Sequence, residues 1–307
     1  MKTRKNDLVE YVILGTLGTL VVLTLVIPQL LRDRGEPQLL FLSVLFRDTD
    51  NTNWTVTRQG MEQAADELGA ELRFLTLTVQ GDGREQAELL RREVEGGAGA
   101  LVVVPADPEA LGETLAQQQS GCPVVALESP VAGAVGTAAP DNALLGRQLA
   151  QALLEDWDGG PVLLLDSASA SSGVTARLEA AQETLDGAGV PNIRVSALPE
   201  GWVSERWVMA FEPSATRQAA DKKEAEGQSY ALYGTGSSTA ITAQLERGTI
   251  QAVAAWSDYA AGYLAVRQAV QAVRERPGEL EPLAFSIVRG EDIYEPENQK
   301  LLFPVTS

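Results

Sequence analysis

Residues 100–127 decide the fold of this chain, and they read ALVVVPADPEALGETLAQQQSGCPVVAL. The first run, Ala100–Val104, is apolar at every position, which is typical of a strand buried on both faces of a parallel sheet. The turn Pro105-Ala-Asp follows it, and the segment Pro108–Gln119 has the period of a helix. A second apolar run, Val124–Leu127, completes a strand-helix-strand unit, so the stretch predicts parallel strands joined by a helix.

The same alternation runs through the rest of the chain. It gives about nine βα units, too many for one compact sheet of short strands, so we expect two stacked lobes. The other predicted strands are Leu39–Phe46, Glu71–Thr78, Pro161–Leu165, Ile193–Ala197, Trp207–Phe211, Tyr230–Tyr233 and Ile250–Ala255. The other predicted helices are Trp54–Leu68, Gly83–Glu95, Asn142–Asp156, Ser172–Ala188, Pro213–Ala225, Ser237–Arg247 and Tyr259–Arg276.

One connection in the second half is too short for this pattern. Only Pro199–Arg206 separates the strand that ends near Leu198 from the strand Trp207–Phe211, whereas a parallel crossover needs about a dozen residues or more. Either a helix is absent from the second lobe, or one of the two strands lies outside its parallel sheet. An absent helix would expose an apolar sheet face beside Trp202 and Trp207.

The composition excludes several classes of protein. Lys and Arg number 24 against 42 Asp and Glu, and the net charge of −18 repels nucleic acid. The chain has no histidine, so the commonest general base and metal ligand is missing. Its one cysteine, Cys122, precedes an apolar strand and is typical of a buried structural thiol. We therefore expect a protein that is not an enzyme, with no metal, no cofactor and no nucleic-acid partner.

The N-terminal segment predicts a membrane anchor. Tyr11–Leu31 carries no charge and is long enough, as a helix, to cross a hydrocarbon layer of about 30 Å. Lys2, Arg4 and Lys5 precede it, which favours a cytoplasmic N-terminus and an extracytoplasmic globular part. The alternative is a cleaved signal peptide, but no small-residue cleavage site follows the apolar run. We expect a single-pass protein of the cell membrane.

The loops that follow the predicted strands carry a resemblance to a known family. The chain resembles the periplasmic binding proteins of the sugar-binding, ribose-binding-like type over nearly all of residues 38–290. The similar segments are Asp50-Asn-Thr-Asn-Trp54, Gly60-Met-Glu-Gln-Ala-Ala-Asp-Glu-Leu-Gly69, Ala100-Leu-Val-Val-Val-Pro-Ala-Asp107, Cys122-Pro-Val-Val-Ala-Leu-Glu128, Pro140-Asp-Asn-Ala-Leu-Leu-Gly146 and Gly248-Thr-Ile-Gln-Ala-Val-Ala255.

The resemblance implies an α/β fold of two Rossmann-like lobes with parallel sheets, joined by a three-strand hinge, the type I periplasmic-binding fold. The crossings would lie near Pro140–Asp141, near Trp256 and near Leu283–Ser286. The implied organisation is a cytoplasmic stub, transmembrane helix and linker over 1–36, a first lobe over 37–139 with 257–283, and a second lobe over 140–256 with 284–307.

The resemblance also implies a ligand site between the lobes. Where sugar binders often carry an Asp-Arg pair, this chain has Glu128-Ser129, which lacks a guanidinium to donate hydrogen bonds. Trp54 and Trp256 would either contact a sugar ring or a heterocycle or pack at the edges of the lobes. The ligand-binding residues that the resemblance implies are Asp50, Asn51, Trp54, Glu128, Ser129, Thr175, Arg177, Glu212, Thr235, Trp256 and Asp258.

Two functions follow from the resemblance. The first is a binding protein that delivers a small polar solute, a sugar or a sugar-like compound, to an ABC-type importer in the same membrane. The second is a membrane-tethered sensor whose ligand-bound form is read by a histidine kinase or another receptor. The sequence does not separate them, because both need an extracytoplasmic domain that closes on a ligand.

Overall fold

A computed structural model describes residues 40–49, 54–118, 121–167, 171–201, 204–274 and 282–303, together with Thr16 and Thr24. The contacts within the chain divide it at Leu39, and the fold of the second unit, from Leu40 onward, is given below. The predicted anchor Tyr11–Leu31 lies outside the described residues apart from Thr16 and Thr24, which are helical and exposed. Within the described residues, no helix is both long and apolar enough to cross a membrane.

The first sheet holds parallel strands in the order β2-β1-β3-β4-β5. Its central strands β3 and β4 are buried at every position, as their apolar sequences predict. Helices cover its two faces, and we call this sheet with α2, α3, α4 and α9 the first lobe. The strands are β1 (Leu40–Leu45), β2 (Ala70–Leu75), β3 (Ala100–Val103), β4 (Val124–Leu127) and β5 (Gly136–Ala138). The helices are α2 (Thr55–Leu68), α3 (Gly83–Glu95), α4 (Pro108–Gln117) and α9 (Asp258–Val273).

The second sheet has the order β11-β10-β9-β8-β6-β7, and only β11 runs antiparallel to its neighbour. We call this sheet with its helices the second lobe. The strands are β6 (Val162–Leu165), β7 (Asn192–Val195), β8 (Trp207–Ala210), β9 (Ala231–Thr235), β10 (Ala252–Trp256) and β11 (Phe285–Arg289). The helices are α5 (Asn142–Asp156), α6 (Ser172–Gly187), α7 (Pro213–Glu226), α8 (Thr239–Glu246) and α10 (Pro296–Leu302), with a 3-10 turn at Gly290–Asp292.

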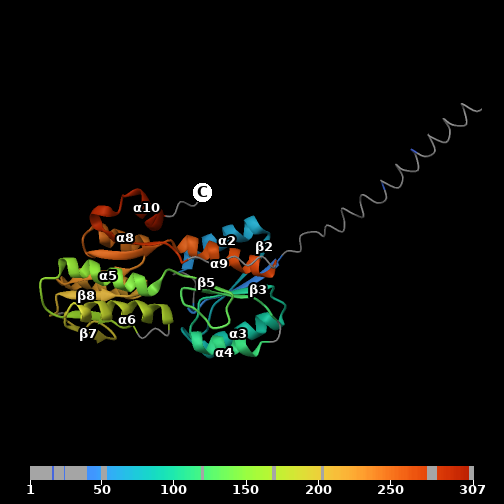
Figure 1. The fold of residues 1–307 in the computed structure, drawn as a ribbon, viewed down its shortest axis with the longest axis horizontal. Helices are drawn as coiled ribbons and strands as arrows, with labels where there is room; N and C mark the ends of the chain where they lie inside the picture. The colour runs from blue at the N-terminus through green and yellow to red at the C-terminus, as the bar shows by residue number, and fades with distance from the viewer. Residues whose placement is uncertain are drawn as a thin grey trace, which may run out of the picture. The chain divides into compact units, whose positions relative to one another are not determined.

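Glycines bring two pairs of helices into close contact. Helices α2 and α9 lie side by side in the first lobe, and α5 and α6 do so in the second (Figure 1). A Cβ atom on Gly60 of α2 would lie 2.0 Å from the carbonyl oxygen of Tyr259, and one on Gly146 of α5 would lie 2.0 Å from that of Arg177. The backbones therefore pack directly against each other, which fixes where α6 carries Arg177.

The chain passes between the lobes at three places. It leaves β5 for α5 at Pro140, it leaves β10 for α9, and it returns from α9 to β11 through Leu283. The first and third passages lie next to each other, because Pro140 and Leu283 form an isolated parallel bridge and Leu283 N donates to Ala139 O at 2.9 Å. The two-lobed α/β arrangement with parallel sheets matches the predicted type I fold.

The short connection in the second lobe corresponds to an absent helix. Strands β7 and β8 both pair in parallel with β6, on its opposite edges, so both belong to the sheet. Between them, residues 196–201 and 204–206 contain no helix. The loop is held instead by α7 and its following turn, where Lys222 Nζ donates to Pro199 O at 2.7 Å and Gln228 Nε2 donates to Gly201 O at 2.9 Å.

The exposed apolar face expected beside Trp207 is not found. Trp207 is only 3 % exposed, because its ring packs at 6.4 Å from that of Tyr233 and its Nε1 donates to Gly159 O. Trp202 lies outside the described residues. Ile193 of the edge strand β7 is exposed, whereas Leu163, its neighbour in β6, is buried.

Candidate functional site

Charged side chains from both lobes converge at the carboxyl ends of the strands, the edge where open α/β sheets bind ligands. Arg47 follows β1, Glu128 follows β4 and Glu212 follows β8, while Asp258 begins α9 directly after β10. Arg177 comes from the second turn of α6. Each interacts electrostatically with others of the set, and we call these five residues the charged cluster.

Arg47 supplies the guanidinium that Glu128-Ser129 lacks. Its Nη1 forms an ion pair with Glu128 Oε2, and the two side chains are 18 % and 11 % exposed. Burial opposes the charge of Arg47, but the charge and hydrogen bond of Glu128 outweigh it and raise the pKa of Arg47. Arg47 is not among the predicted site residues, although it directly follows the first predicted strand in a loop expected to carry function.

Glu128 has an unusual backbone conformation. Its φ of 70° is the one positive value among the described non-glycine residues. Ser129 N donates to Leu127 O at 2.8 Å, so Glu128 lies at the centre of a tight γ-turn, a strained arrangement for an L-residue. Hydrogen bonds from Glu128 N to Ala138 O and from Asn142 Nδ2 to Glu128 O hold it there. Such strain is typical of functional sites.

Ser129 joins the two lobes. Its Oγ lies 2.6 Å from Ser171 Oγ and accepts a hydrogen bond from Gly173 N at 3.1 Å. A Cβ atom on Gly173 would lie 2.7 Å from Glu128 O, so only glycine fits in this contact. The hydroxyl expected to contact a ligand is therefore engaged in holding the start of α6 against the first lobe.

Arg177 is fully buried and incompletely paired. Its Nε donates to Asn142 Oδ1 at 2.7 Å and its Nη1 donates to Phe211 O at 3.0 Å. Its Nη2 has no hydrogen-bond partner among the described residues. Burial lowers the pKa of Arg177, and the negative charge of Glu128 is the largest of the effects that oppose this. A buried donor without a partner costs free energy, so this nitrogen is suited to a ligand oxygen.

Asp258 is a carboxyl group whose ionisation is disfavoured. Burial is the main cause, the charge of Glu128 adds to it, and together they raise the pKa of Asp258 to about 6. A hydrogen bond from Ser237 Oγ at 3.3 Å and the charge of Arg177 work in the opposite direction. Asp258 is therefore harder to ionise than an exposed aspartate, although it is mostly ionised at neutral pH.

The two tryptophans predicted to contact a ligand, Trp54 and Trp256, already contact other side chains of the protein. Trp54 stacks on Phe46 with ring centroids 5.5 Å apart, and its Nε1 donates to Asp48 Oδ2 at 2.5 Å. Trp256 is 6 % exposed, and the Cζ atom of Arg177 lies 4.7 Å from its ring centroid. The rings therefore support the charged cluster from the side of each lobe.

The remaining predicted ligand-binding residues differ in their burial and in their contacts. Thr235 is buried, and its Oγ1 has no hydrogen-bond partner among the described residues. Glu212 is partly buried, with no side-chain hydrogen bond to other described residues. Thr175 is exposed and lines a shallow interlobe pocket with Asp107, Pro108, Glu109, Ser172, Ala176 and Glu179. Asp50 and Asn51 lie outside the described residues.

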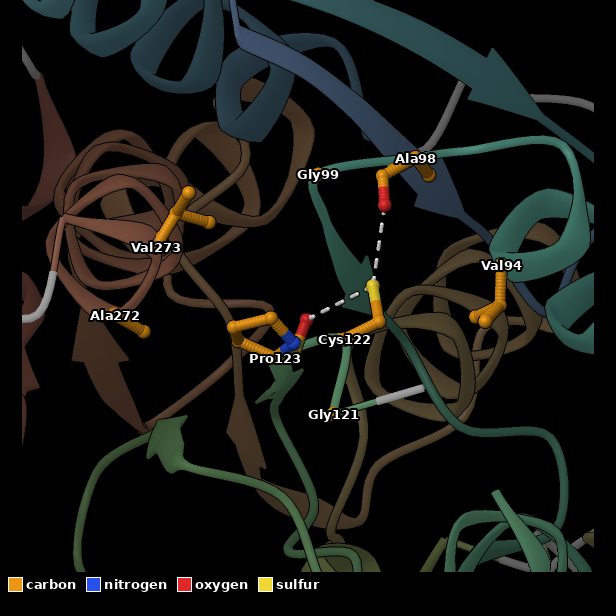
Figure 2. A pocket seen from close by; sticks show the side chains of 8 residues that line it. All are labelled: Val94, Ala98, Gly99, Gly121, Cys122, Pro123, Ala272 and Val273. Carbon is orange, nitrogen blue, oxygen red and sulfur yellow. Dashed lines mark hydrogen bonds between the residues drawn. The ribbon is translucent and has the colours of Figure 1, made fainter. Parts of the chain in front are cut away.

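A second pocket lies at the opposite edge of the first sheet, around the residues that precede β3 and β4 (Figure 2). Its lining carries no charged side chain, and the Cys122 thiol donates to Ala98 O at 3.3 Å. Burial raises the pKa of Cys122 to about 11, which makes the thiol unreactive. Within the described part of the chain, no group of three or more Cys, Asp or Glu is placed to hold a metal ion.

Comparisons with known proteins agree with this fold. Residues 42–207 match the family model described as the periplasmic binding protein domain. A comparison with curated protein sequences finds no match.

Solved structures match over most of their length. An ABC transporter solute-binding protein from Agrobacterium vitis with bound D-fucose is 15 % identical, covers 86 % of this chain and 100 % of its own, and has a TM-score of 0.75. The myo-inositol binding protein from Caulobacter with bound myo-inositol is 18 % identical, with 87 % and 99 % covered and a TM-score of 0.75. The periplasmic component of an ABC-type sugar transport system from Hahella chejuensis is 21 % identical, with 81 % and 99 % covered and a TM-score of 0.74. At these identities the likeness shows a shared fold. With its family model matched over more than half of its length, the chain belongs to the periplasmic binding protein family, a family of solute-binding proteins that are not enzymes.

Proposed function

We propose that this protein is the extracytoplasmic solute-binding component of an ABC-type importer, and that it binds a small hydroxylated solute, a sugar or a sugar-like compound, between its lobes. One observation carries the proposal. The charged cluster joins residues of both lobes, and its buried Arg177 Nη2 has no protein partner among the described residues; the same holds for the buried Thr235 Oγ1 at the carboxyl end of β9.

The mixture of donors and acceptors favours a hydroxylated solute. Arg177 donates only, whereas the carboxylates of Glu212 and Asp258 accept when ionised. A hydroxyl group does both, so one hydroxyl is able to accept from the guanidinium while it donates to a carboxylate. Such charge-assisted hydrogen bonds are short and directional, and they select among solutes by the positions of their hydroxyls.

The related structures support the same solute class. The A. vitis protein has the same fold and holds D-fucose, and the Caulobacter protein holds myo-inositol. Both ligands are ring compounds that carry several adjacent hydroxyls. Two of the three related proteins compared above are described as components of ABC transporters, which supports delivery to an importer as the role of this chain.

The predicted domain boundaries enter the proposal unchanged, and so do the predicted site residues apart from Ser129, whose hydroxyl contacts Ser171 and Gly173. The first lobe would comprise 37–139 with 257–283 and the second 140–256 with 284–307, which agrees with the packing of α9 on α2 and the pairing of β11 with β10. Tyr11–Leu31 would tether the protein to the membrane that holds the permease. Closure of the lobes would bury the solute without any chemical step.

A ligand screen on the full chain tests solute binding. Sugars, polyols, nucleosides and amines are added one at a time, and the melting temperature is measured. A solute present at about a hundred times its dissociation constant should stabilise the protein by about 2.7 kcal/mol. Stabilisation by a sugar or polyol supports the proposal, and the absence of any stabilising solute contradicts it.

Affinity capture from native membranes tests delivery to an importer. The full chain, purified with its bound partners after mild cross-linking, should recover a multi-span permease together with an ATPase. Recovery of a histidine kinase and no permease would show instead that the protein acts as a sensor.

A further inference from the structure

The charged cluster does not balance its own charge. Arg47 and Glu128 form a direct ion pair and neutralise each other. Arg177 interacts with Glu128 and with the carboxylates of Glu212 and Asp258, and Glu212 also acts on Arg47. The cluster therefore holds three carboxylates against two guanidinium groups. Asp48 lies beside Arg47 and adds a further negative charge at the edge of the cluster.

The carboxylates of Glu212 and Asp258 are only partly exposed, so water compensates their charge less than it would at the surface. Burial and the charge of Glu128 raise the pKa of Asp258 to about 6, although Ser237, Arg177 and Trp256 all stabilise its ionised form. A buried carboxylate keeps its charge only when a positive group or several donors balance it. Glu212, whose charge acts on both Arg177 and Arg47, makes no side-chain hydrogen bond to other described residues. The two guanidinium groups therefore do not fully balance the carboxylates of the cluster.

We infer that the solute carries a positive charge in addition to its hydroxyls, as an aminated sugar or an aminated polyol does. Its ammonium group would lie between the carboxylates of Glu212 and Asp258, and one of its hydroxyls would accept from Arg177 Nη2. This inference rests on the proposed function and names the solute class of the same site. Arg177 Nη2 and the excess carboxylate then each have a complement, because an ammonium donates to carboxylates and a hydroxyl accepts from a guanidinium.

Solutes of other charge complement the cluster less well. A neutral sugar leaves the excess carboxylate unbalanced when the lobes exclude water. An acidic sugar pairs with Arg177 but adds a second excess negative charge beside Glu212 and Asp258. The net charge of −18 acts in the same direction at long range, because it attracts cationic solutes and repels anionic ones.

Matched sugars that differ in charge test the inference. We would measure by calorimetry at pH 7 the binding of D-glucosamine, D-glucose and D-glucuronate to the full chain, and of the corresponding galacto and manno compounds. The amine of at least one series should bind about tenfold more tightly than its neutral counterpart, and the acid most weakly. A neutral sugar that binds as tightly as its amine, or any neutral solute that binds when all the amines fail, would refute the inference and leave the proposed function standing. If no solute of any charge binds, both proposals fail.

Asp258→Asn separates the charge effect from a general loss of structure. The substitution keeps the shape of the side chain and removes the excess charge, so it should weaken amine binding about tenfold more than it weakens neutral-sugar binding. Glu212→Gln should shift the preference in the same direction. Asp66→Asn, on the exposed face of α2, changes the net charge equally and should leave the preference as it is. Equal weakening of both solutes by Asp258→Asn and by Glu212→Gln would overturn the inference.

Discussion

The guanidinium of Arg177 lies over the indole ring of Trp256, with its Cζ atom 4.7 Å from the ring centroid. Arg177 belongs to α6, and Trp256 ends β10 where the chain crosses to the first lobe. The ring supports the guanidinium from one face, while Asn142 and the Phe211 carbonyl hold two of its nitrogens. The third nitrogen is therefore fixed in position before any ligand binds, which reduces the entropy lost on binding.

Arg177→Lys should weaken binding of the solute found in the screen by at least about tenfold. A lysine ammonium is a point charge on a flexible stem, so it is unable to stack on Trp256 and keep two directed hydrogen bonds while it offers a third. Calorimetric titration measures the change. Arg147→Lys, on the exposed side of α5, is the matched control and should bind as the unsubstituted chain does. Equal affinities of the unsubstituted chain, Arg177→Lys and Arg147→Lys would show that Arg177 does not bind the solute.

Gly173→Ala should loosen the contact between the lobes. The new Cβ would lie 2.7 Å from Glu128 O and 3.0 Å from Ser129 Oγ, too close for either group. We expect a loss of about 1–3 kcal/mol in the free energy of unfolding and weaker solute binding, measured by urea denaturation and calorimetry.

Gly187→Ala is the control for this substitution, because the residue lies in the same helix and a Cβ there meets nothing within 4 Å. It should leave the stability unchanged or raise it by about 0.5–1 kcal/mol, since alanine favours a helix over glycine. If both substitutions changed the free energy of unfolding in the same direction, the close contact at Gly173 would be contradicted.

The stability of the protein should depend on pH through Asp258. Its pKa of about 6 in the folded state lies above the ordinary value of 3.8, so the folded protein keeps this proton over a range in which the unfolded chain releases it. Asp258 therefore lowers stability progressively as pH rises from about 4 to about 6, and the loss stays constant above that range.

Asp258→Asn should remove this dependence. The melting temperature of the variant should exceed that of the unsubstituted protein by roughly 4 °C at pH 7 and equal it near pH 4. Differential scanning calorimetry across this pH range measures the difference. A difference that is the same at pH 4 and pH 7 would show that Asp258 titrates normally in the folded state.

Cys122 should resist alkylation in the native protein. Its half-buried thiol has a pKa raised to about 11 by burial, so little thiolate exists at pH 8. Iodoacetamide should label it on the order of a hundredfold more slowly than in denaturant, as followed by mass spectrometry. The chain has one cysteine, so the readout is unambiguous. Equal rates in the two conditions would show that the thiol is accessible and ionised.

The bounds of helices and strands were predictable where the capping residues and the apolar pattern indicate the same element. The bounds of α3, α5 and β4 are those that the sequence predicts, because capping aspartates open the two helices and β4 is uniformly apolar. Strand β5 and helix α10 were not predicted. Residues Gly136–Ala138 have a weak strand propensity, and they form β5 only because they pair with β4.

The sequence predicts which loops carry the candidate site better than it predicts the side-chain contacts within that site. Strand ends identify the loops that carry Glu128, Glu212 and Asp258, and all three join the charged cluster. The partnership of Arg47 with Glu128 joins residues 81 positions apart and leaves no local pattern. Ser129 was expected to contact a ligand, yet its hydroxyl contacts Ser171 and Gly173, because the distance between the lobes is set by packing.

The sequence by itself determined the alternation of strands and helices, the two-lobed α/β fold and the absence of histidine chemistry, since these follow from local periodicity and composition. Only the tertiary structure shows that β7 and β8 are joined without a helix and that Arg47 pairs with Glu128. It alone also shows that Arg177, stacked on Trp256, has one nitrogen with no partner among the described residues. These depend on distances between segments far apart in the chain. Local sequence fixes the conformation of each segment, whereas the balance of buried charge is fixed only when the segments pack together.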